Sequence, residues 1–136
     1  MGNAPFTRAV RAAGVSLVLA LAAGCAAGSA LRAGQRAEQL NDYDLAVAEY
    51  TSALRDDPES REARAALDRA RLRAADAHFG RGRRLASQDR FQEALSEFQI
   101  ANELNPASAD IEDALRRARS ALRATLATAS GQTAME

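Results

Sequence analysis

The chain has 136 residues, room for one modest domain, and about a quarter of them are alanine, the strongest helix former. Valine is absent after Val47 and the only isoleucines are Ile100 and Ile111, so β-sheet formers are too sparse to build a sheet. The 18 basic residues, all arginine, balance 18 acidic ones. No basic tail or acidic run points to nucleic acid. The composition predicts an all-α fold.

The first 25 residues have the three parts of a bacterial export signal. Arg8 and Arg11 form the positive region, residues 12–23 are apolar, and small residues precede Cys25. An apolar stretch of about a dozen residues is too short to span a bilayer, which needs about 20. The pattern therefore predicts a signal peptide over residues 1–24.

The segment Leu21-Ala22-Ala23-Gly24-Cys25 resembles the lipobox of bacterial lipoproteins, although that motif most often has leucine at the place of Ala22. The resemblance implies that Cys25 is acylated and that residues 25–30 form a lipid-anchored linker. In a diderm bacterium, Ala26 implies an outer-membrane anchor with the domain facing the periplasm, because the aspartate that retains such proteins at the inner membrane is missing. The alternative is an ordinary cleaved signal that ends near Gly28-Ser29-Ala30.

Two segments, residues 42–71 and 90–119, are related by a spacing of 48 residues. A fixed period over two copies is typical of stacked-helix arrays, whose units bury their apolar faces on one another. Such arrays usually bind proteins, which favours a scaffold over a catalyst. The clearest matching pairs are Tyr43 and Phe91, Ala46 and Ala94, Tyr50 and Phe98, Ala53 and Ala101, Pro58 and Pro106, and Leu67 and Leu115.

Local signals predict where the helices begin. Asp42 is expected to cap a helix starting near Tyr43, and Asp89 one starting near Phe91. Asp57-Pro58 and Asn105-Pro106 each place a capping residue before a proline, so two further helices are expected to start near 58 and 106.

These signals give about five helices within a domain at residues 31–128. Residues 58–88 are expected to form one long helix, bent or frayed at Gly80 and Gly82. The last helix is expected over about 106–128, and residues 129–136 are expected to be a disordered tail.

The repeat resembles the tetratricopeptide repeat over residues 27–60 and 75–108. That family places small residues, an aromatic residue and a proline at fixed positions. The matching residues are Gly34, Ala46, Tyr50, Ala53 and Pro58 in the first copy, and Gly82, Ala94, Phe98, Ala101 and Pro106 in the second. The resemblance implies a right-handed superhelix of antiparallel helix pairs, which approach closely where small residues meet. Two features depart from the family: its large aromatic at the fourth position is Ala30 or His78 here, and the period is 48 residues instead of about 34.

Residues for catalysis or for binding a metal or cofactor are sparse. The chain has one histidine and one cysteine, and His78 falls at a packing position of the repeat. One histidine cannot make a metal site, and Gly80-Arg81-Gly82 lacks the third glycine of a dinucleotide-binding loop. We therefore expect no catalytic residues, no metal and no cofactor, and a protein that is not an enzyme.

A candidate partner-binding face follows from the resemblance, because in tetratricopeptide arrays the first helix of each pair lines the concave groove. In the second copy this face carries Asp76, Phe79 and Arg83. An aromatic residue beside arginine is the composition of many interface hot spots. The alternatives are that other helices cover Phe79, and that the arginines near it form an ordinary solvated face.

The repeat pattern has Ala77-His78 before Gly82-Arg83-Arg84-Leu85 and a second helix that ends at a proline. In these features it is also similar to the periplasmic tetratricopeptide segment of some secretin-family proteins of type II secretion and type IV pilus systems. The similarity implies a lipid-anchored periplasmic scaffold that binds secretion or pilus proteins, with no nucleic acid and no small-molecule substrate as partner. Two alternatives stay open. One is a general envelope adaptor for cell-wall or outer-membrane assembly proteins, and the other is a truncated secretin-like remnant.

Overall fold

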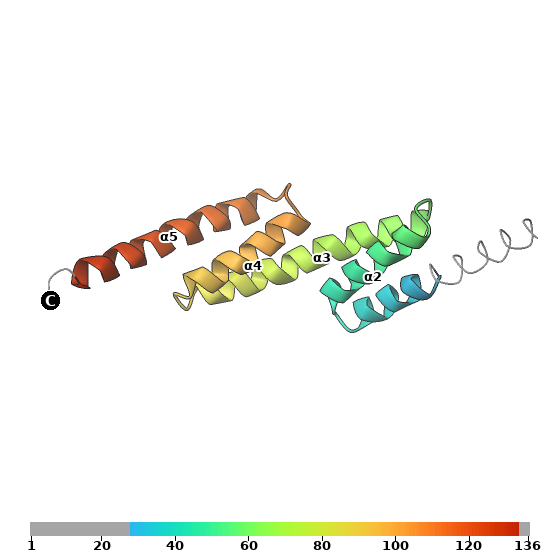
Figure 1. Cartoon of the computed structure of the whole chain (residues 1–136), viewed down its shortest axis with the longest axis horizontal. Coiled ribbons are helices and arrows are strands. Elements are labelled where there is room, and N and C mark those ends of the chain that lie inside the picture. Colours follow the sequence, from blue (N-terminus) through green and yellow to red (C-terminus); the bar gives the residue numbers. More distant parts are fainter. Residues whose placement is uncertain (1–27, 134–136) are drawn as a thin grey trace, which may run out of the picture. The chain divides into compact units, whose positions relative to one another are not determined.

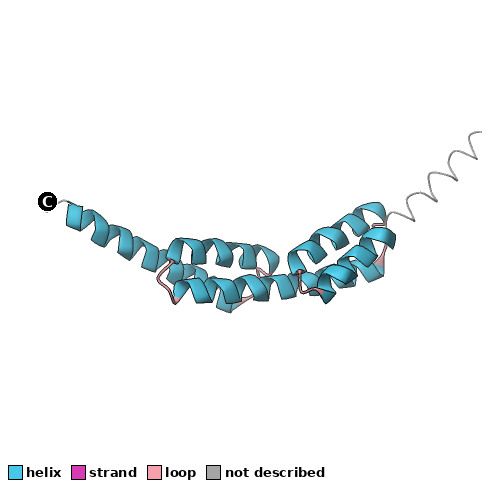
Figure 2. Cartoon of the chain, turned by 90° about the horizontal axis from the view of Figure 1, so that it is seen from below, coloured by secondary structure: helices cyan, strands magenta, loops and turns pink. Residues whose placement is uncertain are grey.

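The computed structural model describes residues 28–133, with side chains for residues 28–130. Every regular element in this range is an α-helix (Figure 2). The helices are a first segment at residues 28–39, α2 (Tyr43–Asp56), α3 (Arg61–Ala86), α4 (Phe91–Leu104) and α5 (Ala109–Thr133) (Figure 1). The predicted all-α class with five helices is confirmed for this part of the chain. The predicted signal peptide and Cys25 lie outside it.

The turns that follow the first helix and α3 have the same geometry. Asn41 and Asp89 are the two non-glycine residues with positive φ, at 57° and 58°, within the described range. In the first turn, the Asp42 amide donates to the Ala37 carbonyl (2.9 Å) and the Asn41 amide donates to the Glu38 carbonyl (3.0 Å). This is the Schellman pattern, with a short polar residue where glycine is commonest.

Asp89 occupies the same place after α3, so the predicted N-cap role of Asp89 is wrong. The start at Phe91 is correct, but the residue before it is Arg90, which makes no side-chain cap hydrogen bond. The Arg90 guanidinium instead pairs with the Glu93 carboxylate in the first turn, with Nε 2.7 Å from Oε1. The corresponding prediction for α2 is confirmed, since Asp42 Oδ1 accepts from the Leu45 amide at 3.1 Å.

The predicted helix starts near residues 58 and 106 are wrong by about one turn. Asp57 and Asn105 end the preceding helices at φ −137° and −140°, and their amides donate to Ala53 and Ala101. The Asp57 carboxylate accepts from the Glu59 amide at 3.2 Å, so it caps a turn at residues 58 and 59, and the regular α-helix begins only at Arg61. Ser60 lies just before α3, where its hydroxyl accepts from the Ala63 amide (3.3 Å). Pro58 and Pro106 are exposed turn residues and not packing residues.

Two further boundaries differ from the prediction. Residues 28–30 of the expected linker are already helical. At the other end α5 continues to Thr133, so residues 129–133 of the expected tail are helical, and residues 134–136 lie outside the described range. The single long helix is confirmed, with bounds Arg61–Ala86, and it passes through Gly80 and Gly82 without the fraying expected there.

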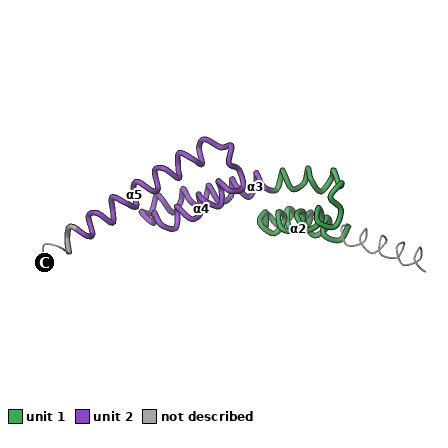
Figure 3. The backbone as a smooth tube through the Cα atoms, turned by 45° about the horizontal axis from the view of Figure 1, so that its top comes forward, with its two compact units in different colours: residues 1–70 green, residues 71–136 purple. Residues whose placement is uncertain are grey.

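The chain divides into two compact units, and the division falls between Ala70 and Arg71 within α3 (Figure 3). Each unit has its own core, made largely of alanine around one aromatic ring: Tyr50 in unit 1 and Phe98 in unit 2. Such alanine-rich cores depend on backbones that approach closely. The buried small residues Ala46, Ala53, Ala94 and Ala101 are at most 2% exposed.

Each aromatic ring rests on a glycine of the neighbouring helix. A Cβ added at Gly82 would lie 2.6 Å from Phe98 Cε1, and one added at Gly34 would lie 2.6 Å from Tyr50 Cδ1. These distances are well below van der Waals contact, so each ring occupies the space that any side chain on the glycine would need. The two glycines are 48 residues apart, so the same contact is built twice.

Candidate partner-binding groove

Unit 2 carries a groove of about 510 Å³. Its lining comes from α3, α4 and α5, and consists of three phenylalanines, two arginines, one aspartate and four alanines: Phe79, Arg83, Ala86, Phe91, Phe98, Asp110, Ala114, Arg117, Ala118 and Ala121. The volume is within the range of protein ligand pockets, and an aromatic floor with a few charged groups is typical of binding sites.

Phe79 forms part of the floor of this groove and part of the core beneath it. The ring is half-buried, and its centroid lies 5.8 Å from that of Phe98 at an interplanar angle of 49°. It also packs against a buried cluster that contains Ala101 and Ile111. Phe79 therefore belongs to the packing of unit 2, and the alternative that other helices cover it is partly correct.

The charged groups of the groove are not paired with one another. The Arg83 guanidinium carbon lies 5.9 Å from the Phe79 ring centroid, a cation–π contact. No ion pair joins Arg83, Arg117 or Asp110 to another residue of the described chain. Two arginines against one aspartate leave the groove with a net positive charge, which favours an acidic partner.

Unit 1 offers an internal comparison, because every groove residue except Ala121 has a counterpart in it 48 positions earlier. There, Gln35 Nε2 donates to Glu62 Oε1 (3.3 Å), and Tyr50 Oη donates to Glu38 Oε2 (2.7 Å). In unit 2 the first pair corresponds to Arg83 and Asp110. The second pair, Tyr50 and Glu38, corresponds to Phe98 and Ala86. The side chains of unit 1 thus satisfy each other across the same surface. In unit 2, Ala86 and Phe98 carry no side-chain hydrogen-bonding group, so the bond between Tyr50 and Glu38 has no equivalent there.

Burial of Tyr50 has an electrostatic consequence. Removal of the phenol from water, together with its hydrogen bond to the Glu38 carboxylate, raises the pKa of Tyr50 from 10.0 to about 12. Tyr50 is therefore a neutral donor at any physiological pH. It links α2 to the first helix.

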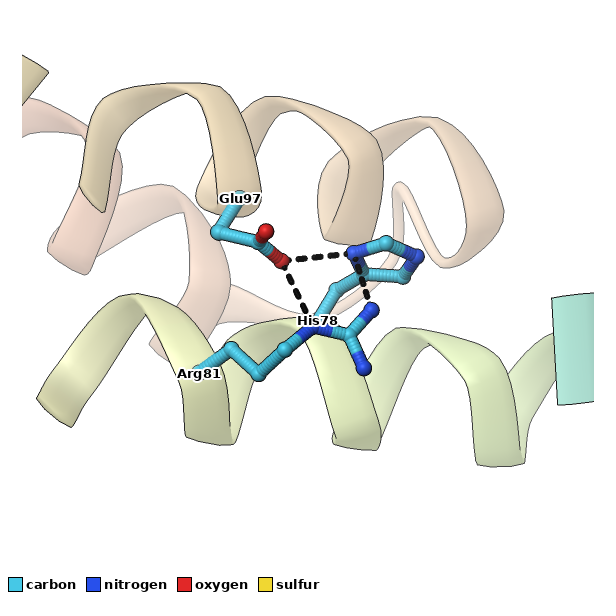
Figure 4. A network of polar contacts seen from close by, with 3 residues as sticks. All are labelled: His78, Arg81 and Glu97. Carbon is cyan, nitrogen blue, oxygen red and sulfur yellow. Dashed lines mark hydrogen bonds and ion pairs between the residues drawn. The ribbon is translucent and has the colours of Figure 1, made fainter. Parts of the chain in front are cut away.

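A polar network joins α3 to α4 in unit 2 (Figure 4). Glu97 Oε2 lies 2.7 Å from His78 Nδ1 and 3.0 Å from Arg81 Nε, while Arg81 Nη2 lies 2.7 Å from the same His78 nitrogen. Nδ1 must carry a proton to donate to Glu97 and must lack one to accept from Arg81, so it serves one of them at a time. Burial raises the pKa of Glu97, but the hydrogen bonds from His78 and Arg81 outweigh it and bring the pKa below its usual value. His78 is 6% exposed, which fits the structural role predicted for it.

The structure brings together two of the three predicted partner-binding residues. Phe79 and Arg83 line the groove, whereas Asp76 is exposed and does not belong to the lining. The contributions of α4 and α5 were missed. A signal for α5 was present, since Asp110, Ala114, Arg117 and Ala121 recur at helical spacing and share one face.

No protein-family model matches the chain, and no curated protein matches it. Within residues 28–133, no helix has the length and apolar character to cross a bilayer.

Proposed function

We propose that this chain is a lipid-anchored periplasmic scaffold of the tetratricopeptide type, which binds a protein of a secretion or pilus apparatus through the groove of unit 2. The groove carries the proposal. It combines three aromatic rings, a floor made by three helices, and two arginines that form no ion pair with any described residue. Large aromatic and arginine side chains supply most of the binding energy in protein interfaces.

Support for the repeat type comes from contacts that recur at the 48-residue spacing. The glycine–aromatic contacts of Gly34 with Tyr50 and of Gly82 with Phe98 are equivalent, and so are the left-handed turn residues Asn41 and Asp89. These are the close approaches that the tetratricopeptide pattern requires of its small positions. The envelope location and the secretin-type partner rest on the similarity of the sequence.

The groove is tested by charge reversal at Arg117, which lies on the same helix as the exposed Arg119 outside the groove. A photo-crosslinking amino acid at Ala121, which lines the groove, should capture the partner in cells. Arg117→Glu should abolish the crosslink and Arg119→Glu should preserve it. Phe79 is a poor test residue because its ring also packs in the core.

The identity of the captured protein decides between the functions. A secretin or pilus component supports the proposal, and a cell-wall enzyme or outer-membrane assembly protein supports a general envelope adaptor. A crosslink at Ala121 that survives Arg117→Glu would contradict binding in the groove.

The anchor is tested separately. Cys25→Ser should remove labelling by a fatty-acid analogue and release the protein from membranes into the soluble periplasmic fraction. A wild-type protein that starts at Ser29 or Leu31 and carries no lipid would contradict acylation.

A further inference from the structure

The turn between the first helix and α2 exposes large apolar side chains. Leu40 is 78% exposed and Leu45 is 46% exposed. Leu40 is among the most exposed large hydrophobic residues of the described chain. The carboxylates of Asp42 and Asp44 are close to them in sequence. Residues 40–45, here called the tip of unit 1, therefore form an apolar projection with negative charge beside it.

The tip has a fixed conformation. Tyr43 Oη donates to Asn41 Oδ1 (2.8 Å), and Asp42 Oδ1 accepts from the Leu45 amide (3.1 Å). The Schellman hydrogen bonds hold the chain that leads into it. A preorganised projection loses little conformational entropy when it is bound, which lowers the free-energy cost of association.

The equivalent turn in unit 2 lacks these features. Counterparts of Leu40 and Leu45 are Gln88 and Glu93, and the counterpart of Asp42 is Arg90, which pairs with Glu93. Repeat geometry therefore does not require exposed leucines at this turn. Of the two equivalent turns, the one in unit 1 carries exposed leucines, and the one in unit 2 carries polar residues at the same positions.

The two units also differ in net charge. Residues 28–70 contain six arginines and nine carboxylates, and residues 71–133 contain ten arginines and eight carboxylates. Unit 1 is thus net negative and unit 2 net positive. Complementary surfaces of this kind accelerate association and favour one arrangement of the partners.

We propose that the tip of unit 1 docks in the groove of unit 2 of a second copy of this chain. Leu40 and Leu45 would enter the aromatic floor at Phe79, Phe91 and Phe98. Asp42 would approach Arg83 or Arg117. The contact joins two different surfaces, so it is heterologous and leads either to a closed ring or to an open chain of copies. The inference rests on the groove being the binding site of the proposed function, with this chain as its occupant.

The test uses the full chain purified in non-ionic detergent, with self-association followed by sedimentation velocity. The tip variant carries Leu40→Gln and Leu45→Glu, the residues that unit 2 has at the equivalent positions. The groove variant carries Arg83→Gln and Arg117→Glu. The control is Leu72→Ser, which removes another exposed leucine in favour of the residue 48 positions later.

The wild-type chain and the control should associate, less at high salt, whereas each variant alone should associate at least about tenfold more weakly. An equimolar mixture of the two variants should form a 1:1 dimer, because it holds one intact groove and one intact tip. That recovery also shows that both variants are folded.

Self-association is refuted if the wild type stays monomeric up to about 100 µM, or if the mixture stays monomeric while both variants keep their helical circular dichroism. In either case the envelope partner of the groove is still decided by the Ala121 crosslink. Conversely, a crosslink at Ala121 only to a second copy would refute the secretion partner and support self-association.

Discussion

Gly82 provides the sharpest test of the packing, because Gly80 two residues earlier is a matched control. Both are inside α3, where replacing glycine by alanine ordinarily stabilises a helix by about 0.5–1 kcal/mol. An added Cβ at Gly80 would meet only the end of the Arg84 side chain, 3.6 Å away at Nη1. Gly80→Ala should therefore raise the free energy of unfolding by about that amount.

At Gly82 the same methyl group would lie 2.6 Å from Phe98 Cε1 and 2.7 Å from Cδ1. Phe98 is 2% exposed and packs against the buried residues Ala94 and Leu115, so the ring cannot move away without disturbing α4 and α5. Overpacking of this kind costs about 1–3 kcal/mol. The helix-propensity gain of about 0.5–1 kcal/mol offsets part of it, which leaves a net loss of up to about 2.5 kcal/mol.

Urea unfolding followed by far-ultraviolet circular dichroism should order the free energies of unfolding as Gly80→Ala above wild type above Gly82→Ala. Phe98→Leu should reduce the penalty of Gly82→Ala, a coupling that a double-mutant cycle measures. If Gly82→Ala stabilises the protein as much as Gly80→Ala does, the close contact between α3 and α4 is wrong.

Three further predictions use the same unfolding assay. Ala94→Leu should lower stability by about 1–3 kcal/mol, because Ala94 is fully buried, and an unchanged melting temperature would refute its place in the core. The pKa of Tyr50 is raised, so its contribution to the free energy of unfolding is complete below pH 10.0 and is lost as the pH rises toward about 12. Tyr50→Phe should not show this loss. The pKa of Glu97 is lowered, so its contribution to the free energy of unfolding is present above about pH 4.5 and is lost as the pH falls below that value. Glu97→Gln should therefore lose less stability on acidification than the wild type.

Much of the fold was predictable, because the signals that determine it are local. Alanine content and the lack of β-branched residues gave the class, and the alternation of small and aromatic residues identified the buried face. The errors are at helix ends. Asp57 and the proline after it form a turn before the next helix begins, and Asp89 takes the left-handed conformation after α3 instead of the N-cap position of α4.

The groove was only partly predictable, because its lining depends on which helices pack together. Phe79 and Arg83 belong to one turn of α3, so they could be found from one helix. Phe91, Asp110 and Arg117 come from α4 and α5, and no local pattern brings them to Phe79. The packing of Phe79 against Phe98 was missed for the same reason, since it is a contact between helices.

The last part of α5 lacks the glycine that makes the tight contact in each unit. Residue 130 falls at the position of Gly34 and Gly82 after a further 48 residues, and it is Ser130. A serine Cβ would occupy the space that the rings of Tyr50 and Phe98 need in the two units. This part of α5 therefore cannot receive a third aromatic residue in the same way, and Leu126, at the position of the buried His78, is 61% exposed. Within residues 28–133 the tight glycine–aromatic contact therefore occurs twice, and the groove lies beside the second of these contacts, where alanine and arginine stand at the positions of Glu38 and Gln35.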